Sequence, residues 1–129
     1  MRHDLLADAL SAITNAAMAG KNNCIIKPSS KLINKIIEIF KREGFIADFK
    51  VIPNSRGGVV EVLFNGKMNK CAAVKPRFST KKEEIESFEK RFLPAKDFGL
   101  LIVSTPKGLF THQEIKEAGV GGKLIAYVY

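Results

Sequence analysis

The C-terminal segment constrains the fold most, because its apolar runs are separated by turn and helix-start signals. Residues 100–103 form an apolar run that stops at the polar sequence Ser-Thr-Pro-Lys-Gly of residues 104–108. Thr111 and Glu114 have the spacing of a capping box, in which each side chain satisfies a backbone N–H group at a helix start. Another apolar run follows at residues 124–129. The pattern predicts a strand, a polar turn, a helix and a last strand.

Two turns in this segment are open to a polar partner. One carries two hydroxyl groups beside a lysine and a glycine, and the other is a pair of glycines before the last strand. Small side chains let a partner approach the backbone closely. The residues concerned are Ser104, Thr105, Lys107, Gly108, Gly121 and Gly122. We predict that they form a binding surface.

Size and charge narrow the kind of partner. The 129 residues suffice for one domain, or for two small modules that pack together. Lysine and arginine number 21 against 13 acidic residues, which gives a formal net charge of +8. This excess favours an anionic partner, either a nucleic acid or an acidic membrane surface. Charge alone does not distinguish these from a merely soluble basic protein.

Cysteine usage and hydropathy give no sign of export or of a metal site. Cys24 and Cys71 are far apart and lack the spacing of a zinc site or redox pair, so buried reduced thiols are the simpler interpretation. We find no secretory signal and no apolar stretch of membrane-spanning length. These features predict a soluble protein of a reducing compartment, with no metal or cofactor.

Apolar periodicity and turn residues in the first half predict an α/β module at residues 1–74. One helix begins after Asp4, and a second, with a broad apolar face, begins after Ser29 or Ser30 and ends at Gly44. The predicted strands lie at residues 24–26, 45–52, 59–64 and 70–74. The last three are expected to form an antiparallel meander with both helices on one face, and the first strand lies at an edge. The strand order stays open.

The second half predicts a mostly β module with one short helix at residues 75–129, so the two modules together give an α+β fold. Its first part, residues 75–97, is a charged connector. We favour a solvent-exposed position for the acidic half, which has the pattern of a short amphipathic helix ending before the next proline. In the basic half, Lys75 and Arg77 flank a stiff turn, and Phe78 either stacks on a partner or packs inside.

Polar residues of the first module extend the candidate surface. The start of the second helix offers hydroxyls, backbone N–H groups and cations to a phosphate. These residues are Lys27, Ser29, Ser30 and Lys31. The amide of Asn15 could meet a ribose or a base edge. Both sites have a simpler interpretation, because most serine-capped helix starts bind nothing and many helical asparagines are merely exposed.

We find no enzyme constellation in the sequence. His3 and His112 have no nucleophile or acid at an interpretable spacing, and no phosphate-binding glycine loop or metal-ligand cluster is present. Ser104 lacks the elbow motif of a serine nucleophile. Three hypotheses therefore remain open at this point: an RNA-binding structural component, an enzyme of unknown type using the Ser104 turn, and a basic membrane-surface protein.

Several short motifs occur in a specific order along the whole chain. They are LADAL at 6–10, KPSSK at 27–31, GFI at 44–46, GKMNKC at 66–71, PRF at 76–78, LPAKDFG at 93–99, STPKG at 104–108 and GG at 121–122. In this order the chain resembles the small-subunit ribosomal protein eight family. The motifs GKMNKC, PRF and LPAKDFG resemble the archaeal and eukaryotic branch of that family.

The resemblance implies a structural protein, not an enzyme, that binds the central domain of small-subunit ribosomal RNA directly and early in assembly. It implies a place in the cytoplasmic ribosome beside other small-subunit proteins, with the hydroxyl turn and the glycine pair against an irregular part of an RNA helix. Phosphate contacts would come from Lys27, Lys31, Lys75, Arg77 and Lys107. Pro106 stands where bacterial relatives commonly have another serine, so Ser104 and Thr105 must carry more of the recognition.

Overall fold

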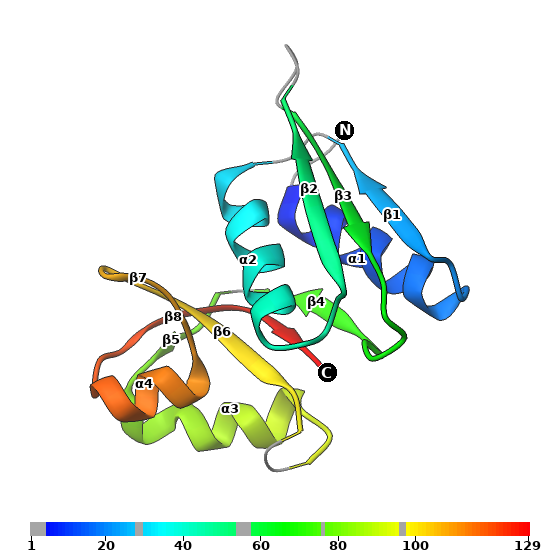
Figure 1. Cartoon of the computed structure of the whole chain (residues 1–129). Helices are drawn as coiled ribbons and strands as arrows, with labels where there is room; N and C mark the ends of the chain where they lie inside the picture. Colours follow the sequence, from blue (N-terminus) through cyan, green and yellow to red (C-terminus); the bar gives the residue numbers. More distant parts are fainter. Residues whose placement is uncertain (1–4, 28–29, 54–57, 76, 96–97) are drawn as a thin grey trace. The chain divides into compact units, whose positions relative to one another are not determined.

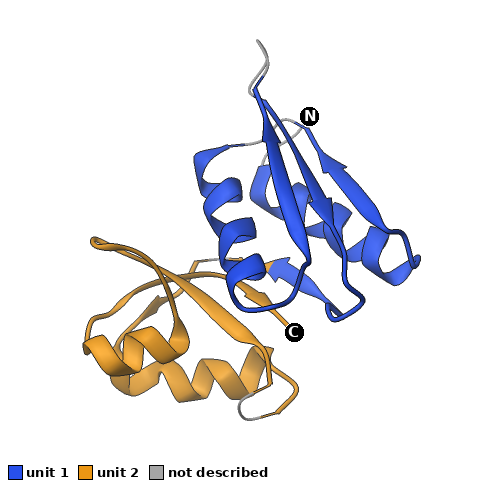
Figure 2. Cartoon of the chain, in the orientation of Figure 1, with its two compact units in different colours: residues 1–72 blue, residues 73–129 orange. Residues whose placement is uncertain are grey.

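The chain forms two compact units, residues 1–72 and 73–129, shown in separate colours in Figure 2. The computed structural model describes residues 5–27, 30–53, 58–75, 77–95 and 98–129. Within these residues, helices and two antiparallel sheets confirm the predicted α+β class. The units divide within a short strand, whereas the sequence suggested a boundary after Val74.

The first unit packs two helices on a three-stranded antiparallel sheet of order β1-β3-β2. Its elements are α1 (Leu5–Met18), β1 (Asn23–Ile26), α2 (Lys31–Arg42), β2 (Asp48–Ile52) and β3 (Val59–Leu63). Figure 1 shows both helices on one side of this sheet. Val60 and Val62 of the central strand are fully buried, as are Leu10 and Ile13 of α1 and Phe40 of α2. Burying this apolar surface is the main stabilising contribution.

The predicted limits of α2 are confirmed. The Ser30 hydroxyl accepts a hydrogen bond from the Ile33 N–H at 3.2 Å, which satisfies one of the unpaired donors at the helix start. Gly44 has a φ of 85° just after the helix, and the Phe45 N–H donates to the Phe40 carbonyl at 2.8 Å. This left-handed turn closes the helix because glycine adopts it without steric cost.

The predicted meander was wrong in its third strand. Both edges of β3 are occupied, by β1 and by β2, so no edge remains for the following strand β4 (Cys71–Ala73). The Thr14 hydroxyl instead accepts from the Cys71 N–H at 2.9 Å and donates to the Cys71 carbonyl at 2.7 Å. A side chain of α1 thus supplies the hydrogen bonds that a neighbouring strand would have given this residue.

The second unit has a five-stranded sheet with path β4-β8-β6-β7, and β5 also pairs with β8. Its further elements are β5 (Ser79–Thr80), a 3-10 turn (Lys82–Glu84), α3 (Ile85–Phe92), β6 (Leu100–Thr105), β7 (Gly108–Thr111), α4 (His112–Ala118) and β8 (Gly122–Val128). Both helices lie on one face of the sheet (Figure 1), where Ile85 and Ile115 pack against Leu101, Val103 and Leu124.

The capping box and the short amphipathic helix are confirmed, but the chain between the C-terminal turn and its helix was predicted wrongly. The Thr111 and Glu114 side chains each hydrogen-bond the other's backbone N–H at the start of α4. The residues before them form β7, which pairs with β6 across a turn, instead of leading straight into the helix. The segment at 75–95 contributes β5 and α3 to the unit, and its Ile85 is fully buried.

Candidate functional site

The hydroxyl turn is a tight hairpin between β6 and β7. Thr105 pairs with Gly108, and the exposed Pro106 and Lys107 form the loop between them. The Thr105 hydroxyl accepts from the Lys107 N–H at 3.1 Å and donates to the Gly108 carbonyl at 2.8 Å. Because this side chain is only 9% exposed, its hydrogen bonds shape the turn. Its predicted contact with RNA stays a prediction.

The Ser104 side chain differs from that of Thr105 in its exposure and in its hydrogen bonds. Its side chain is exposed and makes no hydrogen bond to another residue of the described chain. Ser104 pairs with Lys123 of β8, which in turn pairs with Ser79 of β5. Directly paired residues in antiparallel strands share a face, with their Cβ atoms about 5 Å apart. Ser79, Lys123 and Ser104 therefore form one exposed line across three strands, named here the serine–lysine row.

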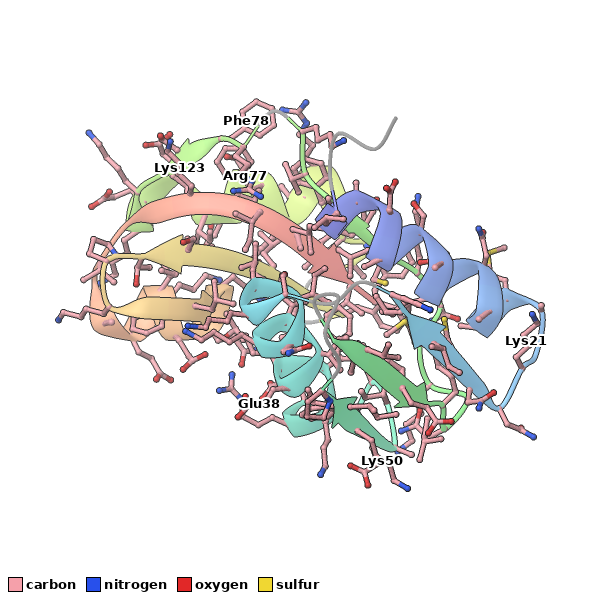
Figure 3. All side chains as sticks on the ribbon, turned by 90° about the horizontal axis from the view of Figure 1, so that it is seen from above. Lys21, Glu38, Lys50, Arg77, Phe78 and Lys123 are labelled. Atoms are coloured by element: carbon pink, nitrogen blue, oxygen red, sulfur yellow. The ribbon has the colours of Figure 1, made fainter. Side chains whose placement is uncertain are left out.

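The face on which the serine–lysine row lies follows from side-chain alternation. Val103 points toward α3 and α4 as part of the core, so the next residue, Ser104, points to the opposite face. Figure 3 labels Lys123 on β8 beside β5. Sequence reasoning missed Ser79 and Lys123. Only the pairing of distant strands brings them beside Ser104, and no local motif reveals that pairing.

The glycine pair has a packing role. A Cβ added at Gly121 would stand 2.5 Å from the Thr80 carbonyl oxygen, and one at Gly122 would overlap the Ser104 carbonyl oxygen. Glycine is required here because β5, β6 and the start of β8 approach too closely for a side chain. Both positions were predicted to bind RNA. The structure adds a reason for glycine that does not depend on a partner.

The basic half of the segment after β4 was predicted to bind RNA through its cations. Lys75 and Arg77 are exposed on either side of residue 76, which lies outside the described residues. Phe78 packs inside the unit: its ring centroid is 5.6 Å from that of Phe88 and 4.8 Å from the Arg91 guanidinium carbon. Figure 3 shows Arg77 and Phe78 side by side in the chain. Of the two roles left open for Phe78, the structure favours packing.

The candidates of the first unit cluster at the start of α2. Lys27 and Lys31 are exposed there, and the half-buried Ser30 uses its hydroxyl as the helix cap. Ser29 lies outside the described residues. Asn15 is exposed in the last turn of α1, separate in sequence from this cluster. The predicted site residues of the first unit therefore comprise the group at the start of α2 and the separate Asn15.

Among the described residues, the one histidine, His112, is not placed to act as a catalytic base for Ser104. His112 is 1% exposed, and its Nδ1 accepts a hydrogen bond from the Leu101 N–H at 3.1 Å. Its Nε2 lies 3.8 Å from the Glu89 carboxylate, which also pairs with the Lys116 Nζ at 2.6 Å. These contacts place His112 among buried structural groups on the helix-covered side of the sheet, away from the Ser104 hydroxyl.

The cysteines also have structural surroundings. Burial raises the pKa of the Cys71 thiol to about 12, and partial burial raises that of Cys24. A thiol with a raised pKa is a poor nucleophile near neutral pH, because little of it is ionised. The Cys71 Sγ donates to the Leu10 carbonyl at 3.4 Å. Neither thiol therefore adds a reactive group to the candidate surface.

The helices in the described part of the chain include none that is both long and apolar enough to cross a membrane. Comparison with protein-family models gives a match to the family described as ribosomal protein S8 over residues 4–129. The matched region includes the first unit from residue 4 onward, the whole second unit and every residue of the serine–lysine row. The chain therefore belongs to the ribosomal protein S8 family.

Proposed function

We propose that this chain binds the central domain of small-subunit ribosomal RNA directly and supports its assembly, with the serine–lysine row and the neighbouring hairpin as its main contact. Membership of the family makes it a small-subunit ribosomal protein that binds ribosomal RNA, a structural component located in the ribosome. The proposal goes beyond family membership in three respects: the central domain as the binding site, the role in assembly, and the residues that make the contact.

The exposed serine–lysine row is the observation that carries the proposal. A-form RNA hides its base edges in a deep major groove, so proteins recognise its minor groove, 2′-hydroxyls and distorted regions. Small hydroxyls such as Ser104 and Ser79 can approach that surface closely and exchange hydrogen bonds with it. Lys123 between them, and Lys107 at the hairpin tip, add positive charge for the phosphates. Hydroxyls and a cation thus alternate along the row, which would allow contacts to both the sugars and the phosphates of an RNA helix.

The group at the start of α2 is proposed to hold neighbouring RNA backbone. Lys27 and Lys31 are exposed beside a helix N-terminus, where the helix dipole and the lysine charges act together on a phosphate. Asn15, Lys75 and Arg77 are further proposed contacts. The chain's net charge of +8 supports this extended electrostatic attraction.

We also propose that the chain belongs to the archaeal and eukaryotic branch and lies beside other small-subunit proteins in the particle. The motifs PRF at 76–78 and LPAKDFG at 93–99 support this assignment, as does Pro106 in place of a second serine. With proline at that position, the hairpin loop has one backbone donor fewer. Recognition then depends more on Ser104 and Lys123.

A binding titration tests this function. The wild-type chain is titrated with a central-domain RNA fragment and with a scrambled duplex of equal length, at two salt concentrations. The Ser104→Ala variant should lose about 1 kcal/mol of affinity for the true fragment, since it removes a hydrogen-bonding group. Lys123→Ala should reduce the salt dependence by about one phosphate contact.

Matched controls are available on the exposed side of the helices in the first unit. Ser11→Ala and Lys35→Ala remove the same groups from exposed positions on α1 and α2. Equal affinity of the wild type for both RNAs would contradict the proposed function. If the wild type prefers the true fragment but Ser104→Ala and Lys123→Ala behave like their controls, the contact lies elsewhere on the chain.

A further inference from the structure

We propose that a cleft at one end of the first unit receives an unpaired nucleotide of the ribosomal RNA, as a second contact separate from the serine–lysine row. The inference rests on the proposed function. The cleft has a volume of about 390 Å³ and lies between the end of α1, the turn that follows it and the loop after β3. None of the predicted site residues lines it.

The cleft is lined by both polar and apolar residues. Ala17, Phe64 and Met68 contribute apolar side chains, and Lys21 and Asn22 contribute polar ones. Phe64 is half-buried, so part of its ring remains accessible. An unstacked base needs such apolar or aromatic surface to replace the stacking it has lost.

Two polar groups at the rim are available to a ligand. The Asn22 side chain is exposed and makes no hydrogen bond to another described residue, while its backbone carbonyl accepts from the Phe64 N–H at 2.9 Å. An amide of this kind offers donors and an acceptor to a base edge. Lys21 is exposed beside it, and Figure 3 shows it at the turn that joins α1 to β1. Its ammonium group could neutralise the phosphate of the same nucleotide.

The loop on the other side of the cleft is held in place. The Asn65 side chain donates to the Gly44 carbonyl at 3.1 Å and accepts from the Lys67 N–H at 3.0 Å. These bonds tie the loop to the end of α2 and hold its backbone at Lys67, whose side chain is exposed. A preorganised rim lowers the entropy cost of binding.

The charge around the cleft favours a nucleotide over an acidic or neutral protein segment. No carboxylate lines the cleft among the described residues. At the nearby end of α2, the Glu43 carboxylate is paired with Arg42, at 3.3 Å from its Nε. Apolar side chains beside an exposed amide and a lysine match a base linked to a phosphate, whereas an acidic peptide would use the lysine but not the apolar side chains.

The test compares a double variant, Lys21→Ala with Asn22→Ala, with the control Lys50→Ala. Lys50 is an exposed cation on β2 of the same unit, apart from Lys21 in Figure 3, so the control removes one positive charge outside the cleft. Circular dichroism first verifies that each variant is folded. We expect the double variant to bind the central-domain fragment about tenfold more weakly, with a salt slope smaller by about one unit, and the control to change little.

Photo-cross-linking with the same fragment, substituted with 4-thiouridine, gives an independent readout. The wild type should form a cross-link within the peptide at 64–68, and the double variant should lose it.

Three outcomes would contradict these proposals. The cleft proposal alone is wrong if the wild type prefers the true fragment, the double variant binds it as well as Lys50→Ala does, and no cross-link forms at 64–68. Equal wild-type binding to the scrambled duplex would overturn the proposed function and the cleft with it. If the double variant loses binding of a poly-glutamate peptide but not of RNA, the cleft takes an acidic protein segment and the proposal is wrong.

Discussion

Ser104 and Thr105 carry the same functional group, yet the structure gives them different tasks. Strand alternation turns the Ser104 hydroxyl outward, while the Thr105 hydroxyl is used by Lys107 and Gly108 in the turn. The sequence indicated both as site residues because a hydroxyl pair at a strand end is a local signal. It did not indicate Lys123, which comes beside Ser104 only through the pairing of β6 with β8.

The glycine at position 122 provides a prediction at this scale. In Gly122→Ala the new methyl group would meet the Ser104 carbonyl oxygen, which belongs to the backbone and cannot rotate away. We expect the variant to lose about 1 to 3 kcal/mol of unfolding free energy, measured by urea denaturation. Ser79→Ala, at an exposed position of the adjoining strand, is the control and should change stability little. An unchanged urea midpoint in Gly122→Ala would contradict the packing role.

At the scale of elements, local chemistry was predictable and pairing was not. The Ser30 cap of α2 and the capping box of α4 involve residues three apart, so the sequence contained the whole signal. The sequence did not show which sheet β4 joins, because this depends on whether β3 still has a free edge. One edge of β3 is occupied by β2 and the other by β1, which lies far upstream in the sequence. The short strands β5 and β7 were missed because two to four residues carry too little periodicity.

The hydrogen bonds between Thr14 of α1 and Cys71 of β4 lead to a prediction about stability. Thr14→Val keeps the shape of the side chain but removes the hydroxyl that hydrogen-bonds both the N–H and the carbonyl of Cys71. We expect a loss of about 1 to 3 kcal/mol in unfolding free energy, because two buried backbone groups lose their partner. Faster hydrogen exchange at the Cys71 amide would accompany it. Thr14→Ser retains the hydroxyl and should be much closer to wild type; equal losses in both variants would instead point to packing of the methyl group.

At the scale of the whole molecule, the buried Cys71 thiol should limit stability in alkali. Its pKa is about 12 in the fold against 9.0 for an unperturbed thiol, so between these values the unfolded chain loses a proton that the folded chain keeps. The associated stability is fully present below pH 9 and is lost as pH rises toward 12.

The unfolding free energy of the wild type should therefore fall between pH 9 and pH 11, by on the order of 1 kcal/mol per pH unit from this group. Urea denaturation of wild type and Cys71→Ala over this range measures it, because the other titrating groups are common to both chains. The variant should be less stable at pH 7, since it leaves a cavity, but should lose less with rising pH. Parallel pH profiles would exclude the thiol as the cause.

The position of β8 in its sheet has a consequence for synthesis. This strand follows all the other strands of its sheet in the sequence, yet it lies between β6 and the strands β4 and β5. A growing polypeptide holds Ser79 and Ser104 on strands that lack their common neighbour until residues 122–128 have left the ribosome that makes them. A chain that stops before residue 122 consequently lacks the serine–lysine row, and under the proposed function it would have only the contacts of the first unit with which to hold RNA.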